Sequence, residues 1–318
     1  MRVSTSMIFN TGTTGMQNRQ YDLYKVQNQL STGRKILSPE DDPIAASEAL
    51  EVGQSKGVNK QFLDNQANAQ SQLTYLESTL GSVSDALLRI TELAKQGDSP
   101  SLSSAQRGMI AAELKGIQSN LLGLANTQDG TGQYIFAGYK SSTKPFTQIT
   151  QTTPPPIYSL GNTFVTYSGD AGKPTLSVTS SKDMAISENG LDVFMQVKDA
   201  SGNVTGRSLF DNLQNLINNM DGSLTYSSAV QTQAMADVSS AVTHISTVRA
   251  SVGARQNSLD GLTAAGEDVG FLYDSRLSEL QDLDYTEAVS RFSNYKVQLE
   301  AAQLTFRQIS QLSLFNIL

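Results

Sequence analysis

Residues 288–309, AVSRFSNYKVQLEAAQLTFRQI, carry the pattern that decides the fold. Apolar side chains recur here at alternating steps of four and three residues, at Ala288, Phe292, Tyr295, Leu299, Ala302, Phe306 and Ile309. This is the heptad spacing of a helix that packs against another helix. A related series occurs near the other end of the sequence, at Met16, Leu23, Val26 and Leu30. The two ends are therefore predicted to be partner-seeking helices, which indicates assembly and not a binding pocket.

The rest of the helical pattern follows from the prolines. All eight lie between Pro39 and Pro174, and proline breaks helices because it lacks an N–H and clashes with the preceding turn. Long helices are thus predicted at 44–96, at 103–126 and through most of 208–318. Asp42 before Pro43 suits a helix cap, as does Ser38 before Pro39. The acidic cluster at 40–42 is interpreted as a helix cap, and the alternative is that these carboxylates bind a metal ion.

Helix length bears on the predicted shape. One helix over 43–96 would span about 80 Å at 1.5 Å per residue. A compact globule of this chain length would be only about 50 Å across. We therefore predict a mainly α protein, an elongated rod of long antiparallel helices with terminal coiled-coil arms.

The middle of the chain has another pattern. From 133 to 207 the helical period is lost, and strand-like runs occur at 134–136, 163–167 and 175–178, separated by Gly, Asn and Asp turn signals. This predicts a small β domain inserted at 139–207. The helical rod domain is then 41–138 with 208–284. The arms are 1–40 and 285–318, and we expect both to be disordered in the monomer because the first is poor in large apolar residues.

Composition excludes several function classes. The 318 residues include 30 acidic and 23 basic ones, for a net charge of −7, which argues against a nucleic-acid partner. Cysteine is absent, so disulfides and thiolate metal sites are excluded. No run of about 18 apolar residues suggests a membrane span, and the first residues lack the apolar core of a cleaved secretory signal.

No catalytic constellation emerges, so we predict no enzyme activity and no cofactor or metal. The single histidine, His244, sits in a helical pattern and is interpreted as a structural residue. Asp282 and Asp284 are interpreted as a turn or cap between helices. The Gly-Thr-Gly at 130–132 lacks the lysine of a phosphate loop. The Asn-Val-Thr at 203–205 matches a glycosylation acceptor, but such short matches are common by chance.

Several motifs together resemble the flagellin family of bacterial flagella. LSTGRKILSPEDDP at 30–43 resembles the family's N-terminal segment between its outer helix and its rod, and RASVGARQNSL at 249–259 is similar to its C-terminal rod motif. The closer match is to the hook-associated junction type and not to the filament subunit. The stretches that carry this distinction are MRVST at 1–5, DDPIAAS at 41–47, QYIFAGYK at 133–140 and SLF at 313–315.

The resemblance implies an extracellular structural protein at the junction of hook and filament. Such proteins form a ring of copies between a neighbouring hook-associated protein and flagellin. They are exported unfolded by the flagellar type III system without a cleaved signal, after a cytoplasmic chaperone has held the C-terminal arm. The expected assembly interface is Leu23, Val26, Leu30, Phe292, Tyr295, Leu299, Phe306 and Ile309. The expected chaperone-binding residues are Leu299, Phe306, Ile309, Leu312 and Leu314.

Three alternatives remain at this point. The first is a short filament-forming flagellin, which would polymerise by itself into long filaments. The second is a secreted enzyme or effector carried by the β insert, although that insert groups too few His, Asp, Glu or Ser residues to nominate a site. The third is a cytoplasmic coiled-coil signalling protein, which would not be recovered from sheared flagella.

Overall fold

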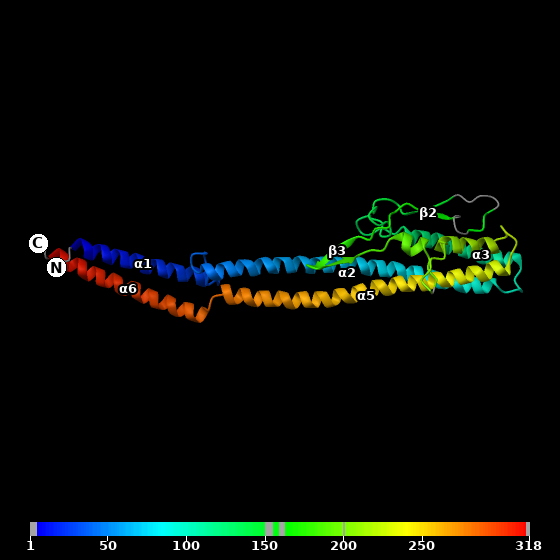
Figure 1. Cartoon of the computed structure of the whole chain (residues 1–318). Helices are drawn as coiled ribbons and strands as arrows, with labels where there is room; N and C mark the ends of the chain where they lie inside the picture. Colours follow the sequence, from blue (N-terminus) through cyan, green and yellow to red (C-terminus); the bar gives the residue numbers. More distant parts are fainter. Residues whose placement is uncertain (1–4, 150–154, 159–162, 200, 316–318) are drawn as a thin grey trace. The chain divides into compact units, whose positions relative to one another are not determined.

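The computed structural model describes residues 5–149, 155–158, 163–199 and 201–315, with side chains of 5, 6, 8 and 309–315 not described. Long helices dominate this part of the chain (Figure 1). In chain order the elements are α1 (Thr5–Thr32), α2 (Pro43–Gly97), α3 (Ser104–Ala125), β1 (Phe146–Gln148), β2 (Val165–Tyr167), β3 (Thr175–Thr179), β4 (Lys182–Ala185), the π-helix η1 (Leu191–Met195), α4 (Leu209–Met220), α5 (Ser228–Gln281) and α6 (Tyr285–Phe315). The predicted class, mainly α with a small inserted β region, is confirmed.

The helices begin where the sequence supplies caps. Asp42 accepts a hydrogen bond at Oδ1 from the N–H of Ala45 at 3.0 Å, so it caps α2 as predicted. Ser103 and Ser208 form capping boxes with Gln106 and Asp211 at the starts of α3 and α4. Ser38 does not begin a helix. Its N–H instead donates to the carboxylate of Asp41 at 3.2 Å, within a turn that precedes Pro43.

The β region consists of two antiparallel hairpins. β1 pairs with β2, with Phe146 opposite Tyr167, and β3 pairs with β4, with Thr175 opposite Ala185. Two of the three predicted strands are confirmed as β2 and β3. The prediction of a strand at 134–136 is wrong: Tyr134 makes a single bridge to Gln128, and a turn follows at once. That turn leads to Gly138, whose φ of 69° interrupts an extended conformation.

The chain divides into two compact units. The first contains Met1–Lys60 and Glu267–Leu318, and the second contains Gln61–Gly266. In the second unit the apolar side of α2, including Leu73, Leu80 and Leu87, packs in one core with side chains of α3, α4, α5 and the β strands. Phe136, Phe146, Phe194 and Phe210 form an aromatic group within that core, with ring centroids 5.0–5.9 Å apart in four pairs. The β region therefore shares its interior with the helices.

In the first unit, α1 and α6 lie side by side (Figure 1). The same unit holds the start of α2 and the end of α5, linked by ion pairs from Lys56 to Asp274 and from Arg276 to Glu48. Within the described residues, none of the helices is both long enough and apolar enough to cross a membrane.

Candidate assembly interface

The packing of α1 against α6 follows the two predicted heptad series. Val26 is 3% exposed and Ala288 is fully buried. The other described members of the predicted interface are half-buried, namely Leu23, Leu30, Phe292, Tyr295, Leu299 and Phe306. Ile309, Leu312 and Leu314 lie outside the residues whose side chains are described. The structure thus brings the two series together as a seam within one chain.

An aromatic pair marks the distal part of this seam. The rings of Phe9 and Phe306 lie 5.1 Å apart between centroids, in a tilted arrangement. Gly12 lies directly beside Phe306: a Cβ at this position would be 2.8 Å from Cδ2 of the ring. The missing side chain therefore allows α1 and α6 to approach closely here. Phe9 and Gly12 lie seven and four residues before Met16, so they continue the heptad spacing of the N-terminal series, although the series predicted from the sequence began at Met16.

Both arm helices also carry apolar side chains that point away from the seam. On α1, Tyr21 and Tyr24 are 66% and 61% exposed; on α6, Val297 and Leu304 are 63% and 59% exposed. Val297 and Leu304 are one heptad apart and each precedes a seam residue by two positions, which places them on the opposite side of the helix. We call these four side chains the back faces of the arms. The seven-residue spacing of Val297 and Leu304 is a second heptad series on α6, parallel to the seam series.

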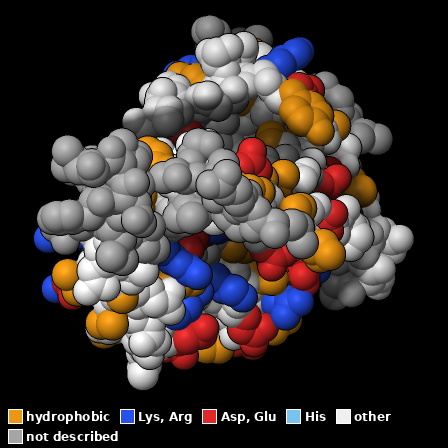
Figure 2. Space-filling view, turned by 90° about the vertical axis from the view of Figure 1, so that its left-hand side faces the viewer, with side chains coloured by type: hydrophobic (Ala, Val, Ile, Leu, Met, Phe, Trp, Pro, Cys, Tyr) orange, Lys and Arg blue, Asp and Glu red, His pale blue; other side chains and the backbone are white. Residues whose placement is uncertain are grey.

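The end-on view in Figure 2 shows how charge and apolar surface are distributed on one face of the described residues. Acidic and basic side chains lie next to one another, and apolar side chains are scattered among them. On this face neither sign of charge predominates.

The acidic residues near the arm connections act as structural groups. Asp284 accepts hydrogen bonds from the N–H groups of Thr286 and Glu287, at 2.9 and 3.1 Å, and so caps α6 as predicted. Asp41 forms an ion pair with Lys25 at 2.6 Å. The hydrogen bond from Lys25, helped by backbone N–H donors, lowers the pKa of Asp41 against the opposing effect of burial.

The loop at 129–133 is organised around one carboxylate. Oδ1 of Asp129 accepts hydrogen bonds from the N–H and hydroxyl of Thr131 and from the N–H of Gln133, at 2.7–2.9 Å. The Gly-Thr-Gly sequence therefore forms a carboxylate-centred turn. This turn lines a cavity of about 440 Å³ together with Tyr75 of α2 and Ser187. Tyr75 donates its hydroxyl proton to the carbonyl of Gln128, which ties the loop to α2.

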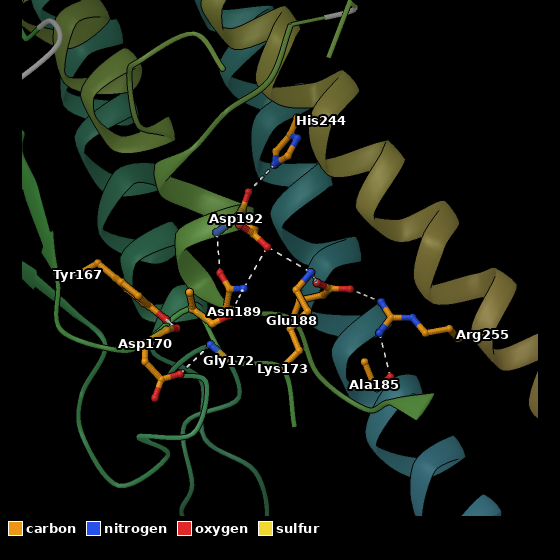
Figure 3. A network of polar contacts seen from close by, with 11 residues as sticks. Tyr167, Asp170, Gly172, Lys173, Ala185, Glu188, Asn189, Asp192, His244 and Arg255 are labelled. Atoms are coloured by element: carbon orange, nitrogen blue, oxygen red, sulfur yellow. Dashed lines mark hydrogen bonds and ion pairs between the residues drawn. The ribbon is translucent and has the colours of Figure 1, made fainter. Parts of the chain in front are cut away.

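A polar network joins the β region to α5 (Figure 3). The buried carboxylate of Glu188 forms ion pairs with Lys173, at 2.6 Å, and with Arg255 of α5. Lys173 also contacts Asp192 of η1 at 3.2 Å. Among the described residues, no group of three or more His, Asp or Glu side chains has an arrangement that could hold a metal ion. The contacts of these charged groups with one another and with backbone atoms therefore connect the β region to α5 and stabilise the fold.

His244 is part of the same network and is buried, in agreement with its predicted structural role. Its Nε2 lies 2.8 Å from the carbonyl oxygen of Asp192, so this nitrogen carries the donated proton. Burial is the main cause of a lowered His244 pKa, and Lys198 adds to the effect, while the hydrogen bond to Asp192 opposes it. The neutral imidazole is therefore the form that fits this site.

Comparison with known proteins gives a consistent family assignment. The family model for the bacterial flagellin N-terminal helical region matches residues 3–141, and the model for the flagellin C-terminal helical region matches 235–318. The flagellar hook-associated protein 3 of Escherichia coli K12 is 30% identical over 329 aligned residues, which cover 100% of this chain and 99% of that protein.

Two solved structures share the fold. A putative flagellar hook-associated protein from Vibrio parahaemolyticus is similar with a TM-score of 0.65 at 20% identity, over 76% of this chain and 100% of that one. The flagellar junction protein FlgL from Legionella pneumophila is similar with a TM-score of 0.59 at 21% identity, over 74% of this chain and 100% of that one.

Proposed function

The chain belongs to the bacterial flagellin family and is of its hook-associated type, and from this premise we propose that it forms the junction between the flagellar hook and filament. In this role copies of the chain pack side by side into a ring. Each copy contributes its paired arms α1 and α6 to the wall of that ring. In this proposal the contacts between copies serve structure alone, and the protein catalyses no reaction.

The two-sided character of the arms is the observation that carries this proposal. The seam residues satisfy the pairing of α1 with α6 inside one chain, while the back faces remain exposed. Most of the large apolar side chains that are exposed in the described residues belong to the first unit, although it is the smaller of the two. Exposed apolar surface of this kind indicates a protein–protein contact.

The back faces differ between the two helices, and this suggests how copies join. That of α1 is aromatic, with Tyr21 and Tyr24, whereas that of α6 is aliphatic, with Val297 and Leu304. Packing the back of α1 onto the back of α6 in the next copy would use two different surfaces. A contact of this head-to-tail type generates a ring when the rotation closes and a helix when it does not.

The same exposed arms suit the remaining proposed partners. The hook side would contact a neighbouring hook-associated protein and the filament side would contact flagellin. Before export, a cytoplasmic chaperone would cover the C-terminal arm at Leu299, Phe306, Ile309, Leu312 and Leu314. Unfolded export through the type III channel is consistent with the lack of cysteine, since no disulfide would have to be broken.

Electron microscopy of a strain lacking this gene tests the proposal. Hooks without filaments, with flagellin released to the medium, are expected, and the wild-type chain should restore attached filaments. Normal filaments in the deletion strain would contradict a junction role. Long filaments formed by the purified chain alone would instead support the alternative of a short filament-forming flagellin.

A further inference from the structure

Two connectors in the first unit are hydrogen-bonded to each other. Residues 33–42 connect α1 to α2, and residues 282–284 connect α5 to α6. The N–H of Leu283 donates to the carbonyl of Gly33 at 3.0 Å, and the N–H of Lys35 donates to the carbonyl of Gln281 at 2.7 Å. These bonds form a short antiparallel bridge between Arg34 and Asp282. We call this paired region the connector joint.

Gly33 has the backbone conformation that the joint requires. Its φ is 70°, and its N–H donates to the carbonyl of Gln29 at 2.8 Å, which ends α1 in the left-handed manner common for glycine. Space is restricted as well, because a Cβ at this position would lie 2.9 Å from the hydroxyl oxygen of Tyr285. A side chain at residue 33 would therefore disturb both the turn and the first residue of α6.

Side chains of α1 hold the same connector from the other side. Gln29 is 5% exposed and donates from Nε2 to the carbonyl of Lys35 at 2.6 Å. The Asp41 carboxylate that pairs with Lys25 accepts hydrogen bonds from the N–H groups of Leu37 and Ser38, at 2.9 and 3.2 Å. The Asp41 side chain is only 14% exposed. The last turns of α1 are thus attached to the connector at two points.

We infer that Lys25 and Asp41 are positioning residues that couple the ordering of the two arms through the connector joint. The ion pair holds residues 37–41 against α1, and this keeps residues 33–35 in place to pair with residues 281–283. Because α6 begins directly after that paired segment, its first turn is placed relative to the end of α1. Only the purpose of this coupling rests on the proposed function: a joint that orders both arms would hold them ready to contact neighbouring copies.

Residue-resolved hydrogen exchange on the full-length chain tests this coupling. In the Lys25→Met variant, the amides of Lys35 and Leu283 should exchange about five-fold faster, the change expected when a partly buried ion pair is lost. Arg19→Met is the matched control, since among the described residues Arg19 forms its ion pair with Asp22, three residues on along α1, and the change should leave both amides unchanged. Acceleration confined to Leu37 and Ser38 would reveal a purely local role and overturn the inference.

Gly33→Ala provides an independent variant. It should accelerate the exchange of the Lys35 and Leu283 amides more than Lys25→Met does, because it strains the turn and meets Tyr285. Gly15→Ala is its control on the same helix, where a Cβ would have no atom within 4 Å. Unchanged exchange of the α3 amides in all variants would confirm that the second unit is folded.

The wild-type chain itself can contradict the inference. If the Lys35 and Leu283 amides are unprotected there, the joint does not form in the single chain and the coupling is absent. Filament attachment is scored separately in the deletion strain. Normal filaments in the deletion strain without any copy of the chain would refute the junction role, while the expected exchange pattern would still support the connector joint.

Discussion

Phe306→Asp is the substitution that most directly tests the packing of the arms. Phe306 is half-buried, contacts the ring of Phe9, and lies close to Gly12. Removing about half of a buried phenylalanine's transfer free energy costs roughly 1–1.5 kcal/mol. Loss of the aromatic pair adds about 0.5–1.5 kcal/mol. Placing a carboxylate against apolar neighbours adds a further 1–3 kcal/mol, approximately.

The sum of about 2.5–6 kcal/mol is large compared with the marginal stability of isolated helices in water. Phe306→Asp should therefore separate α1 from α6, whereas the second unit should stay folded because its core lies elsewhere. Leu299→Asp is expected to behave in the same way. Hydrogen exchange of the α1 amides measures the separation, and filament attachment in the deletion strain measures the loss of function.

Two further substitutions on the same helix separate the seam from the back face. Leu304→Asp should leave the α1 amides protected but prevent attachment, since Leu304 is 59% exposed and has its proposed contact in the next copy. Gln298→Asp, at an exposed polar position, should change neither measurement. Motile cells carrying Phe306→Asp at normal export levels would refute the seam. Equal behaviour of Leu304→Asp and Gln298→Asp would refute the back-face contact.

Three more predictions concern other parts of the chain. Phe194→Ala should lower the free energy of unfolding of the second unit by about 3–5 kcal/mol in urea titrations, because the fully buried ring contacts Phe136, Phe146 and Phe210; Leu88→Ala, at a half-exposed position, should cost far less. The pKa of His244 is lowered, so its contribution to stability is complete above the ordinary value near 6.5 and is lost as pH falls through the lower folded value. His244→Gln should therefore flatten the dependence of stability on pH below about pH 6.5. The raised pKa values of Asp211 and Asp237 change stability in the opposite direction in more acidic solution, and this effect should persist in both proteins. Limited proteolysis of the monomer distinguishes the disorder that the sequence predicts over 1–40 and 285–318 from the α1–α6 pairing in the structure: with the arms paired, both should resist protease about as well as the second unit. Rapid trimming of both arms would contradict the seam, and rapid cleavage within 33–41 would contradict the connector joint.

Local sequence patterns determined the helices and their ends. The heptad spacing of residues 288–309 and the capping positions of Asp42, Ser103 and Ser208 depend on neighbours within a few turns, so they can be read without tertiary information. For the same reason the motifs near both ends were sufficient to indicate the family. The structural role of His244 also followed from its place in a helical pattern, whereas its burial came from the tertiary structure.

Other features depended on contacts between distant segments. In α4, Asn215 is buried because it exchanges hydrogen bonds with the backbone of Tyr158, at 2.6 and 2.7 Å, although its amide would ordinarily favour solvent. The connector joint pairs residues 33–35 with 281–283, and nothing in either short segment specifies the other. Heptad spacing likewise predicts that a helix needs a partner but does not decide whether that partner lies in the same chain or in another copy. Only the tertiary structure decided that α1 and α6 pair within one chain, and this leaves their back faces exposed for the proposed assembly.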